Sequence, residues 1–147
     1  MFLGRYRHTL DAKGRLSIPG KYREVLAKRD GDTLVVTKDP DRCLVILPVD
    51  EWKRLAEKIK TIPGTVQVVK DYKRFFHGEA VDCTLDRQGR MLIPPELRQF
   101  AALDREVMLV GVEDRIEVWS VERWETKAEQ MSRDLDQIAG AIAGYGV

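Results

Sequence analysis

Hydrophobic and polar residues alternate along several short stretches of the chain, and amphipathic stretches of helical period lie between them. Leu16 and Ile18 alternate with Arg15 and Ser17, which is the period of a half-buried strand. A proline suits the start of a short helix, and an Asp-Gly pair suits its end. The pattern predicts strands at residues 5–10, 15–18, 33–37, 43–47, 78–85, 90–93, 107–112 and 115–119, and helices at 21–28 (ended by Asp30-Gly31), from an Asp50 cap, at 65–76, from Pro94 and at the end of the chain.

One nine-residue motif occurs twice. It reads DAKGRLSIP at residues 11–19 and DRQGRMLIP at residues 86–94, a shift of 75 positions. Further on, the stretch 44–46 corresponds to 116–118 at a shift of 72. Internal repeats of this kind indicate a duplicated architecture. We therefore expect two halves that share one core: residues 1–62, a bridging helix at 63–77, and residues 78–147 with a long C-terminal helix.

The last predicted helix carries an apolar seam whose members are separated by alternating steps of four and three. The seam fits two interpretations: an amphipathic helix packed on its own domain, or a helix that docks on another subunit. In the second case the oligomer interface would include Trp124, Met131, Leu135 and Ile138. The full seam consists of Trp124, Ala128, Met131, Leu135, Ile138 and Ile142.

Composition argues against a membrane protein and against a metal-binding protein. At 147 residues with 44% hydrophobic content, the chain has the length and the apolar content of one globular domain. No apolar run approaches the roughly 20 residues of a membrane span, and the chain opens on a charged strand, so we expect a cytoplasmic protein. Cys43 and Cys83 lack metal-ligand spacing and stand at non-equivalent places. We expect free, buried thiols, no metal and no cofactor.

The formal net charge of +1 conceals a strong separation of charge along the chain. Residues 5–29 contain eight basic residues against two acidic ones, whereas residues 99–147 contain ten acidic residues against five basic ones. A concentrated basic segment is typical of a nucleic-acid-binding surface.

Each copy of the motif predicts a loop that aims an arginine. The aspartate can accept bonds from backbone amides two residues on, and the glycine supplies the positive φ that a hairpin with a type I turn and a bulge requires. The arginine after the glycine should therefore begin the returning strand of that hairpin. Asp11 can also pair with Arg15, and Asp86 with Arg90. A guanidinium oriented in this way suits bidentate bonding to guanine or to phosphate.

Three interpretations of the loops compete. The Asp–Arg pair can simply close a structural turn. Alternatively, Asp11 and Asp86 would form a catalytic carboxylate pair, but the neighbouring arginines hold both ionised and no nucleophile accompanies them, so we expect no enzyme and no small-molecule substrate. The third interpretation is binding to double-stranded DNA. Its candidate residues are Arg15, Arg90, Asp11, Asp86, Gly14 and Gly89 in the loops, with Lys13, Arg87, Arg5 and Arg7 as phosphate contacts.

The chain resembles the MraZ family. The resemblance covers nearly the whole chain and depends on the opening Phe2-Leu-Gly-Arg-Tyr-Arg-His8, on the two Asp-x-x-Gly-Arg motifs that run into Ile-Pro, and on Phe75-Phe-His-Gly-Glu-Ala80. It implies an α+β fold in which two halves form a pseudo-two-fold, AbrB-like swapped-hairpin β-barrel core with flanking helices. The family's Asp-x-x-x-Arg signature maps onto Asp11 and Arg15 and onto Asp86 and Arg90.

The same resemblance implies a function. MraZ proteins are transcriptional regulators of the division and cell-wall gene cluster, so we expect a nucleoid-associated repressor that binds short G-rich direct repeats upstream of its own operon as a ring-shaped homo-oligomer. Arg5, Arg7 and Lys13 stand where the second copy has Ala80, Asp82 and Gln88, so the first copy should attract phosphates more strongly. The alternative is an antitoxin-like or scaffolding module that binds a protein partner.

Overall fold

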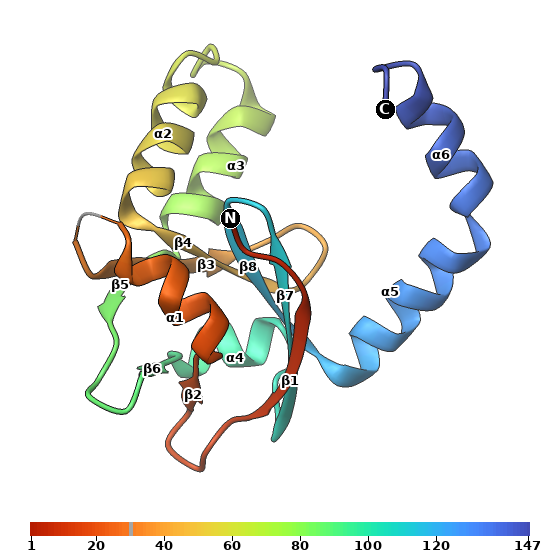
Figure 1. Cartoon of the computed structure of the whole chain (residues 1–147). Helices are drawn as coiled ribbons and strands as arrows, with labels where there is room; N and C mark the ends of the chain where they lie inside the picture. Colours follow the sequence, from red (N-terminus) through yellow and green to blue (C-terminus); the bar gives the residue numbers. More distant parts are fainter. Residues whose placement is uncertain (30) are drawn as a thin grey trace.

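The computed structural model describes residues 1–29 and 31–147, in which the chain forms a mixed α+β fold with a six-stranded antiparallel sheet (Figure 1). Asp30, expected to end the first helix, lies outside the described residues. The elements are β1 Arg5–Thr9, β2 Arg15–Ser17, α1 Gly20–Ala27, β3 Thr33–Lys38, β4 Leu44–Pro48, α2 Val49–Lys60, α3 Gln67–His77, β5 Val81–Thr84, β6 Arg90–Leu92, α4 Pro95–Phe100, β7 Glu106–Val112, β8 Arg115–Ser120, α5 Val121–Arg133 and α6 Leu135–Ala143.

The strands pair across the two halves of the chain. The large sheet has the order β1-β7-β8-β4-β3-β5, and β2 pairs with β6 in a separate two-stranded sheet. In the sequence repeat, β1, β2, β3 and β4 correspond to β5, β6, β7 and β8. When each strand of the large sheet is exchanged for its equivalent, the strand order is simply reversed. At the centre, Val45 of β4 pairs with Glu117 of β8, its own equivalent at the shift of 72.

The β1–β2 segment is not a paired hairpin, contrary to our expectation. An isolated bridge between Leu10 and Leu16 closes the loop. On either side of this bridge the two strands diverge, and β1 pairs with β7 while β2 pairs with β6. The apolar side chains explain this divergence, because Leu16 and Met91 are both buried in the main core. The strand that begins with Arg15 is therefore held by the other half of the chain.

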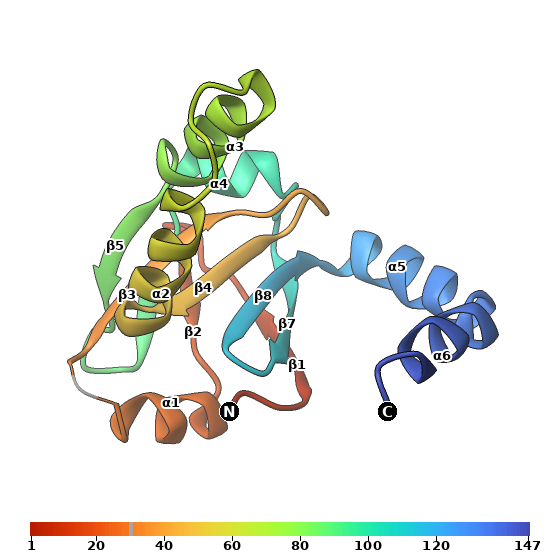
Figure 2. The same cartoon turned by 90° about the horizontal axis from the view of Figure 1, so that it is seen from above.

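The main hydrophobic core lies between the large sheet, the β2–β6 pair and helices α1 and α4. A second cluster joins α2 and α3 to the sheet through Val45, Leu47, Ile59 and Phe76. Figure 2 shows that this helical hairpin projects from one side of the sheet, while α5 and α6 extend from another. The loops before β2 and β6 thus lie at the opposite end of the molecule from the α2–α3 hairpin (Figure 1).

Two expectations about helix boundaries were wrong. Asp50 does not cap α2, because the helix already begins at Val49, after Pro48. Asp50 lies in the first turn of the helix, where its carboxylate accepts a hydrogen bond from Arg29 at 2.8 Å. The long final helix is divided at Asp134, whose φ of −98° and ψ of 11° separate α5 from α6. Asp134 makes no side-chain capping bond to α6, but its negative charge suits the positive N-terminal end of that helix.

Helices of the kind that span a membrane, long and apolar, are not found among the described residues.

Candidate nucleic-acid interface

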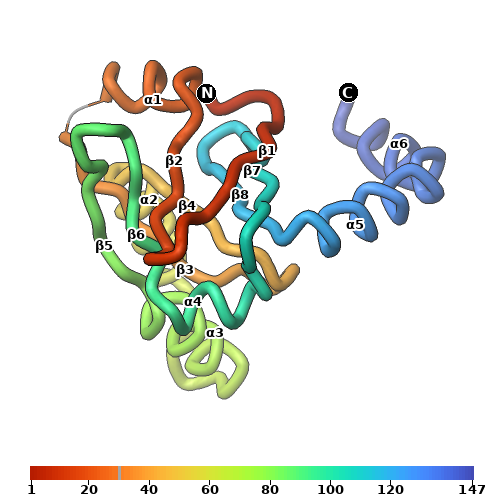
Figure 3. Tube along the Cα trace, turned by 90° about the horizontal axis from the view of Figure 1, so that it is seen from below, coloured from red at the N-terminus to blue at the C-terminus, as the bar shows by residue number. Residues whose placement is uncertain are grey.

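The two motif loops lie on one face of the molecule, joined by the β2–β6 pair (Figure 3). The amide of Ile18 donates to the carbonyl of Gly89, and the amide of Ile93 donates to the carbonyl of Gly14, both at 2.9 Å. These two bonds are equivalent under the 75-residue shift. Each loop is therefore anchored to the strand that follows the other loop.

The first loop is organised by the carboxylate of Asp11. Oδ1 accepts hydrogen bonds from the amides of Lys13 at 3.0 Å and Arg15 at 2.9 Å. Oδ2 accepts from Nε of Arg15 at 2.6 Å. One carboxylate thus holds both the turn and the direction of the guanidinium.

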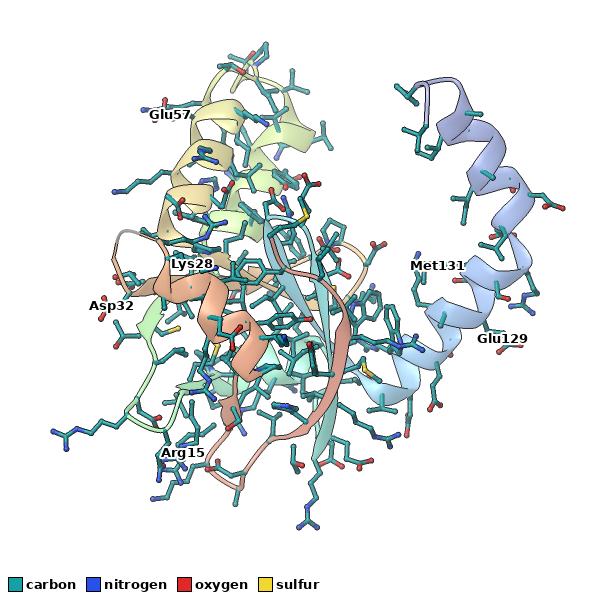
Figure 4. All side chains as sticks on the ribbon, in the orientation of Figure 1. Arg15, Lys28, Asp32, Glu57, Glu129 and Met131 are labelled. Atoms are coloured by element: carbon teal, nitrogen blue, oxygen red, sulfur yellow. The ribbon has the colours of Figure 1, made fainter. Side chains whose placement is uncertain are left out.

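The second loop repeats the arrangement. Oδ1 of Asp86 accepts from the amides of Gln88 and Arg90, each at 2.9 Å, and Oδ2 accepts from Nε of Arg90 at 2.9 Å. The Arg15 and Arg90 side chains are 35% and 28% exposed, respectively. Both guanidinium groups are therefore held rigidly and remain reachable from solvent. Figure 4 places Arg15 at the loop end of the molecule.

Both loop carboxylates are stabilised in the ionised form. The amide of Arg15 first, and then its side chain, hold the pKa of Asp11 below its ordinary value. The amide and side chain of Arg90 do the same for the pKa of Asp86. A pair of carboxylates that both stay ionised lacks the proton donor that acid–base catalysis needs.

Both loop glycines have the positive φ that the sequence predicted, +83° at Gly14 and +74° at Gly89. They also provide space for an arginine of the other half. A Cβ at Gly14 would lie 2.6 Å from Cζ of Arg98, and a Cβ at Gly89 would lie 2.7 Å from Cδ of Arg23. The glycines therefore serve both the turn and the packing between halves.

Arg23 and Arg98 belong to the site, although our sequence analysis did not include them. Nε of Arg23 donates to the carbonyl of Ile18 at 3.1 Å, and Nε of Arg98 donates to that of Ile93 at 3.0 Å. Each guanidinium lies against the opposite loop. Their equivalent places in the repeat were a usable signal, since each follows its motif proline by four residues.

The remaining basic candidates differ in their surroundings. Lys13 and Arg87 are exposed at the loop tips. Arg7 lies before the loop on β1, where Nη2 is 2.7 Å from Oε2 of Glu106. The guanidinium of Arg5 lies over the ring of Trp124, 5.9 Å from its centroid. Arg5 and Arg7 thus interact with other parts of their own chain, while Lys13 and Arg87 face solvent.

The apolar seam of the C-terminal helices divides into two parts. Trp124 and Met131 pack with Cys43 and Trp119 of their own chain. Leu135 and Ile138 are exposed on α6. The first part of the seam is therefore used within the chain, and the second part presents an apolar face to solvent.

The two cysteines lie outside the motif loops. Cys43 is buried and Cys83 is half-buried, and both are free thiols. Burial raises the pKa of Cys83 to about 11. In the part of the chain that the structure describes, no three His, Cys, Asp or Glu side chains are grouped so that they could hold a metal ion.

Comparison with known proteins gives consistent matches over the chain. A family model described as "MraZ protein, putative antitoxin-like" matches residues 1–74 and 76–141. Curated relatives from Natranaerobius thermophilus, Caldanaerobacter subterraneus subsp. tengcongensis and Alkaliphilus metalliredigens are 40%, 41% and 42% identical over 147 residues, covering all of this chain and all of each relative. Each of these relatives is named "Transcriptional regulator MraZ".

Proposed function

The chain belongs to the MraZ family, and from this premise we propose that it is a transcriptional regulator that binds double-stranded DNA through the two motif loops. The observation that carries the proposal is the matched pair of carboxylate-held guanidinium groups. Nε of Arg15 is 2.6 Å from Asp11, and Nε of Arg90 is 2.9 Å from Asp86. Held through Nε, each arginine keeps its terminal nitrogens for a bidentate acceptor such as O6 and N7 of guanine.

The second element of the proposal is a tandem duplication with a pseudo-two-fold, AbrB-like core in which hairpins are exchanged between the halves. The palindromic strand order supports it, as do the paired bonds between Ile18 and Gly89 and between Ile93 and Gly14. In this arrangement residues 1–62 and 78–147 are the halves, and the segment 63–77 joins them. A pseudo-dyad through β2–β6 would present two equivalent arginines to the DNA.

The third element concerns DNA target and assembly. We expect a ring-shaped homo-oligomer that binds short direct repeats upstream of its own division and cell-wall gene cluster and represses it at the nucleoid. Several loop pairs on one ring would bind several repeats at once, so linkage would raise the overall affinity. Lys13 and Arg87 would contact phosphates and position the loops.

A titration tests this function. Wild-type protein should bind a duplex from its own upstream region more tightly than a shuffled duplex at the same salt concentration. Arg15→Ala and Arg90→Ala should each lower the affinity for the upstream duplex more than that for the shuffled one, by about 1–3 kcal/mol of discrimination per arginine. Equal losses on both duplexes would contradict base recognition.

A protein-interaction module remains the second candidate. The exposed apolar face of α6 favours it, because such a face is typical of a docking surface. Footprinting on the upstream region favours the regulator, whereas a stoichiometric protein partner in the absence of DNA binding favours the module.

A further inference from the structure

Helix α6 leaves the body of the molecule (Figure 2), and its large apolar side chains are exposed. Its exposed large side chains include Leu135, 59% exposed, together with Ile138 and Ile142. None of its residues is buried. The segment 134–147 carries two acidic residues, Asp134 and Asp136, and no basic one. It is therefore an apolar strip with a negative end.

The tip of the α2–α3 hairpin has the complementary character. Its exposed aliphatic side chains are Ile62, Val66 and Val68, the last of them 71% exposed. Lysines stand at positions 58, 60 and 70, and they outnumber the two flanking acids, Glu57, which lies 3.6 Å from Lys60, and Asp71, which pairs with Arg74. This hairpin tip is therefore an apolar patch with a positive rim.

We propose that α6 of one copy of the chain docks on the hairpin tip of the next copy, and that this contact builds the oligomer. The inference depends on the proposed function, whose ring it supplies with a specific interface. The apolar residues of the two surfaces would cover each other, and the lysines would meet Asp134 and Asp136. Two α6 helices facing one another would instead bring together segments that carry acidic residues and no base.

The positions of the two surfaces suit this assembly. Both project from the body, and both lie away from the motif loops at the other end of the molecule (Figure 1). In Figure 4, Glu57 marks the hairpin near its tip, and Met131 marks the side of α5 that faces the body. A contact between two different surfaces is heterologous, so it continues from copy to copy and closes when the rotation permits a ring. The loops stay free for DNA.

Complementation between two variants tests the contact. The hairpin variant combines Val66→Asp with Val68→Asp, and the α6 variant combines Leu135→Asp with Ile138→Asp. All four positions are exposed, and Val66 is the N-cap of α3, where Asp is favourable, so the folds should be retained, as far-UV circular dichroism would check. Each variant alone should be a monomer by sedimentation velocity. An equimolar mixture should give a 1:1 dimer and nothing larger, because only one intact surface of each kind remains.

Val112→Asp is the matched control, since Val112 is an aliphatic residue that is 43% exposed outside both surfaces, and this variant should assemble like the wild type. A hairpin variant that still assembles alone would overturn the proposal and favour pairing between α6 helices. Two monomeric variants that fail to complement would also overturn it, as would a monomeric wild type, which would leave α6 to a different protein. Binding of the monomeric variants to a duplex with a single repeat, lost on Arg15→Ala, tests the DNA function independently.

Discussion

Nη1 of Arg90 lies 4.0 Å from Oδ2 of Asp11, so the carboxylate of the first loop faces the arginines of both loops. Asp11 already accepts three hydrogen bonds from its own loop. Asp86 accepts three bonds from its own loop in the same manner. The two arginines therefore form one cluster, and Asp11 stands at its centre.

Because Asp11 also lies near Arg90 of the other loop, removing the two carboxylates should have unequal effects. Asp11→Ala should lower sequence-specific DNA affinity more than Asp86→Ala, because it loosens Arg15 directly and also removes a counter-charge from Arg90. The measurement is the ratio of the affinities for an upstream duplex and a shuffled duplex at fixed salt. If Asp86→Ala costs as much specificity as Asp11→Ala, Asp11 does not act on both loops.

Lys13 should act on every DNA sequence alike. Lys13→Ala should weaken binding to upstream and shuffled duplexes equally and flatten the slope of log affinity against log salt by about one unit. The repeat supplies a matched control, because Gln88 stands at the equivalent place in the second loop. Gln88→Ala should leave the slope unchanged. An unaltered slope in Lys13→Ala would remove this lysine from the phosphate contacts.

Gly14 should tolerate alanine poorly. Its φ of +83° strains an L-residue by about 1–2 kcal/mol, and the new Cβ would also displace the guanidinium of Arg98 from the loop. Gly31→Ala separates the two effects, because Gly31 has a φ of +85° and open space at its Cβ. Chemical denaturation should show a larger loss of stability for Gly14→Ala than for Gly31→Ala. Equal losses would show that the Arg98 contact contributes nothing.

The pKa values of Asp11 and Asp86 predict a loss of stability in acid. Both pKa values are lowered in the folded protein, so their contribution is complete above the ordinary Asp pKa of about 3.9 and disappears as the pH falls through the lower folded values. The wild type should therefore be more stable than Asp86→Asn near neutral pH. This difference should vanish only below about pH 4. A difference that is lost near pH 6 would mean that another group is responsible.

The local chemistry of the loops could be predicted from the sequence, because it depends on neighbours. The positive φ of Gly14 and Gly89 and the pairing of each aspartate with the arginine four positions on are confirmed. Most strands and helices also begin and end within a few residues of the predicted positions. These features arise from contacts between residues that lie close together in the sequence.

Features that depend on contacts between the halves follow from no short-range pattern, and only the family resemblance implied that the two halves exchange hairpins. The pairing of β1 with β7 and of β2 with β6 joins segments that are far apart in the chain, and no short-range pattern specifies it. Arg23 and Arg98 acquire their place in the site only through this pairing. The division of the last helix at Asp134 was missed because the apolar seam continues unbroken across it.

The most direct test of the central claim replaces guanine with 7-deazaguanine in the repeats of the upstream duplex, which removes the N7 acceptor from the major groove. We expect this change to weaken binding of the wild type and to have little further effect on the Arg15→Ala/Arg90→Ala double variant. If the double variant loses as much affinity as the wild type, or if the wild type loses none, the loop arginines do not read guanine.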